Sequence, residues 1–189
     1  MNSRLWVLLS ALAISTGVAQ EFVVEPKKPL TLKRIHFVLD VSGSLAPNIS
    51  RVFDAVRTLA APGSDELSIK VTVFSDTPAT WGLGWVDMPG PQDMEQAQKT
   101  IDSLPHRATR VLPAIVPAAQ EPQTPKGSEK PLGPITIVLV TDGLFVEESG
   151  ERILQAVKDS KHPVLVFGVG NQNEDFLKAL GECGGGYVR

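Results

Sequence analysis

Short apolar runs alternate along this chain with segments whose apolar residues recur every three or four positions. The runs at 35–39, 135–140 and 164–169 are nearly continuous and rich in Val and Ile, as in strands that are covered on both faces. Residues 67–74 alternate enough to predict a further strand, and residues 80–86 predict an antiparallel edge strand beside it. The pattern predicts an α/β fold in three layers, with a central, mostly parallel sheet, one antiparallel edge strand and helices on both faces.

Helical periodicity marks the segments between these strands. Apolar residues at positions 49, 52, 53, 56 and 59 predict a helix that ends before Pro62 and Gly63. Shorter patterns predict helices around 94–104, 111–116, 153–157 and 176–180, and Pro113 and Pro117 are expected to limit the second of these. Residues 121–134 contain four prolines and two glycines without periodicity, which predicts an exposed, mobile loop.

The first twenty residues have the pattern of a secretory signal peptide. Arg4 precedes an apolar run at 5–14, and Gly17-Val18-Ala19 supplies small residues for cleavage. The run is shorter than the roughly 20 residues needed to span a bilayer, although an uncleaved anchor is the alternative. We therefore predict a signal peptide at 1–20, a linker at 21–33 and one domain at 34–189. The expected location is secreted or periplasmic, with membrane contact only during export.

Charge and cysteine content narrow the classes of partner. The formal net charge is −3, and no long basic run is present, which argues against nucleic acid as a partner. Cys183 is the only cysteine, so an internal disulfide is impossible. Cys183 itself is expected to be a small apolar filler, with a reactive or intermolecular thiol as the alternative.

Oxygen-bearing side chains follow two of the predicted buried strands. Asp40-Val41-Ser42-Gly43-Ser44 comes directly after the run at 35–39, and Thr141-Asp142-Gly143 ends the run at 135–140. The carboxyl ends of parallel strands share one edge of a sheet, where ligands bind. Carboxylate and hydroxyl oxygens suit Mg²⁺, Mn²⁺ or Ca²⁺, whereas the scattered histidines do not suggest zinc. The alternative is ordinary capping and turn chemistry, in which Ser and Asp are common.

The first of these motifs resembles the Asp-x-Ser-x-Ser motif of von Willebrand factor type A domains, which forms a metal-ion-dependent adhesion site in that family. Residues 109–115 are similar to the family's Thr-x-Leu-x-x-Ala-Leu segment, and residues 140–143 to its Thr-Asp-Gly strand end. Residues 166–170 and 177–188 resemble its closing strand, helix and Gly-Gly-Tyr segment. The ordered resemblance covers residues 34–189 and implies the family's Rossmann-like fold.

The resemblance also implies a role for each matching residue. Ser42, Ser44 and Thr109 would bind Mg²⁺, or Mn²⁺ or Ca²⁺, directly through their hydroxyls, and Asp40 and Asp142 would act mainly through bound waters. An ion held in this way would accept a Glu or Asp carboxylate from a protein partner as a further ligand.

The sequence departs from the family's pattern in two places. Arg107 and Ala108 stand where the family usually has glycines, so we expect Thr109 to contribute less than the other ligands. The sequence ends at Arg189, whereas the family commonly has a final helix whose shift controls affinity. A large affinity switch is therefore not expected.

The sequence favours an exported, non-catalytic binding module over two other classes of function. One alternative is a metal-free structural or assembly domain of the same fold. The other is an enzyme, such as a hydrolase with Ser42 or Ser44 as nucleophile. The chain has no Gly-x-Ser-x-Gly motif there and no histidine with an obvious place beside these serines. A phosphotransferase using Asp40 would need a second acidic residue where Ser42 stands.

Overall fold

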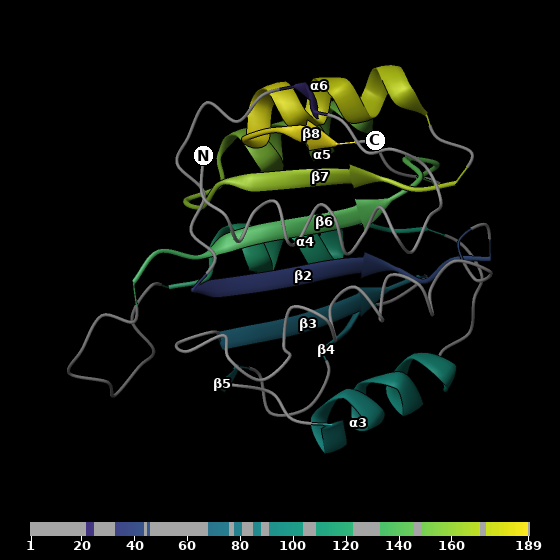
Figure 1. Cartoon of the computed structure of the whole chain (residues 1–189). Coiled ribbons are helices and arrows are strands. Elements are labelled where there is room, and N and C mark those ends of the chain that lie inside the picture. The colour runs from purple at the N-terminus through teal and green to yellow at the C-terminus, as the bar shows by residue number, and fades with distance from the viewer. Residues whose placement is uncertain are drawn as a thin grey trace.

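Four parallel strands form the centre of the computed structural model. They are β2 (Arg34–Asp40), β3 (Ser68–Phe74), β6 (Thr136–Thr141) and β7 (Val164–Gly168), and their arrowheads lie at the same end (Figure 1). Each lies within one or two residues of a strand predicted from the sequence. The structure describes residues 22–24, 33–43, 45, 68–75, 78–80, 85–87, 91–103, 109–122, 133–145, 149–170 and 173–188. The predicted signal peptide and the helix predicted at 49–59 lie outside these residues.

Antiparallel strands lie at both edges of this sheet. The strand order is β1-β8-β7-β6-β2-β3-β4, and β5 also pairs with β3. At one edge, β4 (Pro78–Thr80) and β5 (Val86–Asp87) pair with β3 in the antiparallel sense, close to the predicted edge strand at 80–86. At the other edge, β8 (Tyr187–Val188) is parallel to β7 and antiparallel to β1 (Phe22–Val24). The segment expected to be only a linker therefore contributes a strand, which pairs with backbone groups that β8 would otherwise expose.

Three helices form a layer on one face of the sheet. They are α4 (Leu112–Ala119), α5 (Gly150–Lys158) and α6 (Glu174–Gly184), with α4 packed against α5 and α5 against α6. These helices and α3 (Pro91–Asp102) confirm four of the predicted helical segments. Pro117 lies inside α4 instead of ending it. The helix continues because the following residues, Ala118 and Ala119, are buried, and packing supplies most of the stability of a short helix.

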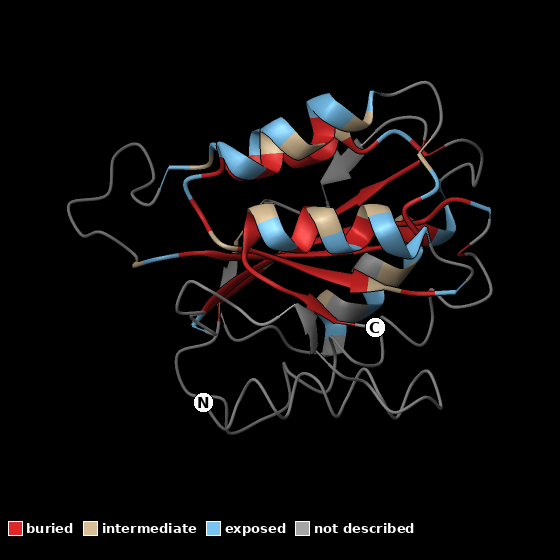
Figure 2. Ribbon diagram, turned by 90° about the horizontal axis from the view of Figure 1, so that it is seen from above, coloured by how far each residue is buried: buried red, intermediate tan, exposed pale blue. Residues whose placement is uncertain are grey.

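The core follows from the apolar strand runs. Strands β2 and β6 are buried at every residue, on both faces of the sheet, whereas the helices alternate buried and exposed residues (Figure 2). No helix among the described residues has the length and apolar character required to cross a membrane.

The order of the strands creates a switch point at the centre of the sheet, between β2 and β6. The chain passes from β2 to β3 on one side of β2, and later returns to β6 on its other side. Connections leave the carboxyl ends of β2 and β6 in different directions at such a point, and ligands commonly bind there in α/β sheets. Asp40 ends β2, and Asp142 follows β6.

Candidate functional site

Hydrogen bonds at this switch point join the carboxyl ends of β2 and β6. Leu39 pairs with Val140 across the two strands, so the next residues, Asp40 and Thr141, are neighbours. The Thr141 hydroxyl donates to Asp40 Oδ2 at 2.7 Å, and the Ser42 backbone N–H donates to Asp40 Oδ1 at 2.9 Å. Both oxygens of this buried carboxylate are therefore held in place.

The two carboxylate oxygens of Asp142 differ in their contacts. Its Oδ1 accepts a hydrogen bond from the backbone N–H of Leu144 at 3.0 Å. Its Oδ2 is buried and has no hydrogen-bond partner among the described residues. The side chain is held by the turn at Gly143, which has φ of 76°. A Cβ at Gly143 would also lie only 3.0 Å from Leu177 Cδ2, so the turn requires glycine.

Ser42 and Thr109 reach the same edge of the sheet. Both are buried, with exposed fractions of 2% and 3%. The residue after Thr109, Arg110, donates its backbone N–H to the carbonyl of Ser75 at 2.9 Å, directly beyond β3. The structure thus brings Asp40, Ser42 and Asp142 together and places Thr109 at the adjoining strand end. Ser44 lies outside the described residues.

Burial and the neighbouring Asp142 both disfavour the charge on Asp40. Burial raises the pKa of Asp40 above its ordinary value, and hydrogen bonds from Ser42 and Thr141 oppose this rise. The negative charge of Asp142 raises the pKa of Asp40 further. A cation would stabilise these two buried carboxylates, one of which has an oxygen without a hydrogen-bond partner among the described residues.

The available donors fit a hard divalent cation. No group of three or more His, Cys, Asp or Glu side chains suited to a metal occurs among the described residues, so hydroxyls would have to complete any site built on Asp40 and Asp142. This oxygen-only set suits Mg²⁺, Mn²⁺ or Ca²⁺ and not zinc. His36 and His162 are both buried, and each contacts Glu121.

Sequence reasoning missed the role of Thr141. The Thr-Asp-Gly motif was recognised, but only Asp142 was considered as a site residue. The Thr141 hydroxyl also accepts the backbone N–H of Gly143 at 3.1 Å, so it links the turn to Asp40. The signal that could have identified it is the pairing of β2 with β6, which makes the residues at the two strand ends neighbours.

Comparison with known proteins places the chain in one family. The model of the von Willebrand factor type A domain matches residues 35–188. No curated protein matches the chain at a significant level.

Several solved structures share the fold. An aerotolerance-related membrane protein from Bacteroides fragilis is 18% identical with a TM-score of 0.57, over 79% of this chain and 86% of that one. A von Willebrand factor type A protein from Catenulispora acidiphila is 12% identical with a TM-score of 0.61, over 87% and 43%. The manganese-loaded TRAP protein of Plasmodium vivax is 19% identical with a TM-score of 0.58, over 87% and 66%. At these identities the likeness concerns the fold.

Proposed function

Because this chain belongs to the von Willebrand factor type A domain family, we propose that it is an exported, non-catalytic binding module. In this proposal a Mg²⁺-type ion, with Mn²⁺ or Ca²⁺ as alternatives, captures a Glu or Asp side chain of a protein partner. The residues proposed to hold the ion are Asp40, Ser42, Ser44, Thr109 and Asp142.

One observation carries the proposal. Asp40 and Asp142 are buried beside each other at the switch point of the sheet, and Oδ2 of Asp142 has no hydrogen-bond partner among the described residues. Burying two acids without a counter-charge costs free energy, and a structural role would be met more cheaply by neutral residues. A cation at this position would offset that cost.

The chemistry of the neighbouring residues supports capture of a carboxylate. Ser42 and Thr109 offer neutral hydroxyls, and Asp40 is already engaged by Thr141 and Ser42. A divalent ion bound mainly by neutral ligands retains charge with which to attract an acidic side chain. The manganese-loaded structure among the proteins of the same fold supports the choice of a divalent ion.

Export rests on the sequence of residues 1–20, with its basic start, apolar run and small residues. The described histidines give no support to a hydrolase, because His36 and His162 lie against Glu121 and not beside Ser42. Family members generally serve as binding modules without catalysis, which agrees with this arrangement.

Isothermal titration calorimetry with Mg²⁺ and Mn²⁺ tests the metal site. The wild type should bind one ion, and Asp142→Ala should show no binding. Asp102→Ala is the matched control, because Asp102 is an exposed carboxylate on α3 that accepts a hydrogen bond from Gln98. Equal heats from wild type and Asp142→Ala, or no heat from either, would leave the metal-free structural role as the better explanation.

Capture of the partner is tested separately. The wild type should retain a protein from the exported fraction in Mg²⁺ and release it in EDTA, whereas Asp142→Ala should retain it in neither. Addition of free glutamate-rich peptide should compete with the partner. Retention that is the same in Mg²⁺ and EDTA would contradict metal-dependent capture even if the ion binds.

A further inference from the structure

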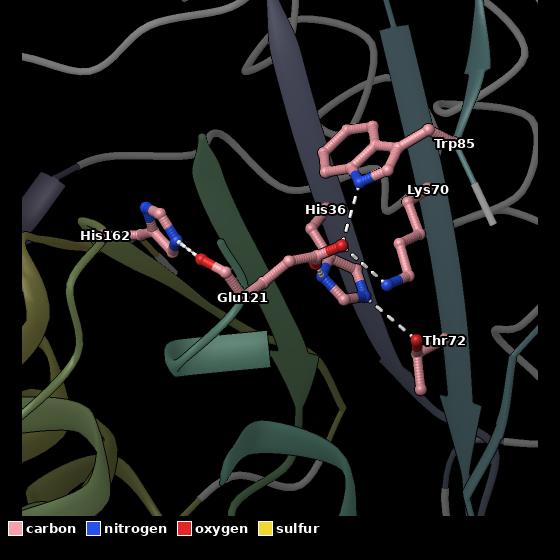
Figure 3. A network of polar contacts seen from close by, with 6 residues as sticks. All are labelled: His36, Lys70, Thr72, Trp85, Glu121 and His162. Carbon is pink, nitrogen blue, oxygen red and sulfur yellow. Dashed lines mark hydrogen bonds and ion pairs between the residues drawn. The ribbon is translucent and has the colours of Figure 1, made fainter. Parts of the chain in front are cut away.

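A second buried polar cluster lies at the opposite end of β2 and β3 from the candidate metal site. Its centre is Glu121, two residues after the end of α4 (Figure 3). Lys70 Nζ and Trp85 Nε1 each donate to Glu121 Oε1 at 2.8 Å, and His36 Nδ1 lies 2.9 Å from Oε2. We call these four residues the Glu121 clasp. Glu121 is the first residue of the loop at 121–134 that the sequence predicts to be exposed and mobile, and these contacts anchor it.

Further contacts surround the Glu121 clasp. His36 Nε2 lies 2.9 Å from the Thr72 hydroxyl, and His162 Nε2 lies 2.7 Å from the backbone carbonyl of Glu121. The guanidinium of Arg34 stacks over the Trp85 ring at 4.1 Å. Contacts therefore reach Glu121 from β2, from β3, from the residue before β5 and from the segment before β7. The end of α4 is held from several directions at once.

The beginning of α4 is fixed at the other end of the same two strands. Arg110 bonds to Ser75 beyond β3, and Thr109, a proposed metal ligand, immediately precedes Arg110. The Glu121 clasp lies where His36 of β2 pairs with Lys70 of β3. The sheet edge that carries the proposed metal site, called the metal edge below, lies where Asp40 pairs with Phe74. The two pairs are four strand residues apart, or about 13 Å. Helix α4, with 8 residues, is about 12 Å long.

The sides of α4 contact the core mostly through small residues. Three of its four buried residues are alanines, namely Ala114, Ala118 and Ala119. The N-cap residue of the helix provides no capping hydrogen bond from its side chain. Small side chains interlock little with the sheet, and no charged residue of the helix fixes its height. Apart from the packing of Ile115 in the core and of α4 against α5, the contacts at its two ends set the position of α4 along the strands.

We propose that Glu121 is a positioning residue for Thr109, acting through α4 as a rigid link between the Glu121 clasp and the metal edge. This inference rests on the proposed function, because it assigns Glu121 a role in the same site. Loosening the clasp would let α4 shift along β2 and β3 and would move Thr109 away from Asp40 and Asp142. The fold and the carboxylates themselves would stay in place.

A double-mutant cycle tests the inference on the full chain. Glu121→Gln should weaken Mg²⁺ binding about threefold to tenfold in the wild-type background. In a Thr109→Ala background the same substitution should change Mg²⁺ affinity by less than about twofold, because the hydroxyl that Glu121 is proposed to position is then absent. Glu95→Gln is the matched control, since it breaks an exposed pair with Lys99 on α3 and should leave Mg²⁺ affinity unchanged.

Hydrogen exchange provides a second measurement that needs no metal. The backbone N–H of Arg110 should exchange faster in Glu121→Gln than in wild type, and by a larger factor than the amides of β6, which report the loss of global stability. If Glu121→Gln folds poorly, Trp85→Phe removes one donor to Glu121 and keeps an aromatic ring beside Arg34, and should show the same changes on a smaller scale.

The outcomes separate the two proposals. A wild type that binds neither Mg²⁺ nor Mn²⁺ would refute the proposed function and with it this inference. If the wild type binds Mg²⁺, two results would overturn the positioning role alone. One is an equal effect of Glu121→Gln on Mg²⁺ affinity in the wild-type and Thr109→Ala backgrounds. The other is exchange at Arg110 that is accelerated no more than exchange in β6.

Discussion

Acid should weaken this fold through the single carboxylate of Glu121. Burial would raise the pKa of Glu121, but the contacts with His36, Lys70 and Trp85 outweigh burial and lower it from 4.5 to about 2. A shift of this size corresponds to roughly 3 kcal/mol of stability. Solvent reaches one side of the cluster, where the Lys70 side chain is 19% exposed, so we reduce the expected contribution to roughly 2 kcal/mol.

The sign of the effect follows from the lowered pKa. The charged carboxylate is favoured in the folded state, so its contribution is complete above the unfolded value of 4.5 and disappears as the pH falls through about 2. At pH 3 roughly 1 kcal/mol should remain. Glu121→Gln removes the charge with little change in shape, and should therefore destabilise the protein more at pH 7 than at pH 3.

Urea unfolding of wild type and Glu121→Gln at both pH values measures this difference. The gap between the two free energies of unfolding should be roughly 2 kcal/mol at pH 7 and about half of that at pH 3. Glu95→Gln, which alters an exposed pair, should match the wild type at both pH values. A gap for Glu121→Gln that is equal at pH 7 and pH 3 would refute the charge-based argument and indicate a packing effect.

Two further substitutions test the site and the core. Asp40→Asn should abolish Mg²⁺ binding while keeping or raising the melting temperature without metal, because the raised pKa of Asp40 means that its charge opposes folding near neutral pH; a large loss of metal-free stability would contradict this. Gly181→Ala should cost about 1 to 3 kcal/mol in urea unfolding, since its Cβ would lie 2.5 Å from Tyr187 Cβ. Glu182→Ala, at an exposed position of the same helix, should change stability by less than about 0.5 kcal/mol.

The parts of the fold that sequence predicts well are those that local patterns determine. Strands β2, β6 and β7 are covered on both faces, so their nearly continuous apolar runs identify them without knowledge of their partners. Strand β1 has three residues and no comparable run, and it exists through its pairing with β8. A strand that depends on a distant partner leaves little local signal.

The same distinction applies to the polar residues. Asp40 and Asp142 could be predicted because each directly follows a recognisable buried strand. Glu121 could not, since it lies at the start of a segment rich in proline and its donors Lys70 and Trp85 are 51 and 36 residues away. Local composition indicated an exposed loop, and tertiary contacts determined the actual burial of this carboxylate.

The hydrogen bond between Thr141 and Asp40 also determines when the site can exist. It joins residues separated by 101 positions, and the second carboxylate, Asp142, comes from the same late part of the chain. During synthesis, Asp40 and Ser42 emerge long before β6, so the centre of the sheet must wait for residues of the last third of the chain. Closing so long a loop delays the pairing of β2 with β6. An incomplete or unfolded chain therefore has no preformed pair of carboxylates, and the proposed metal capture would belong only to the finished fold.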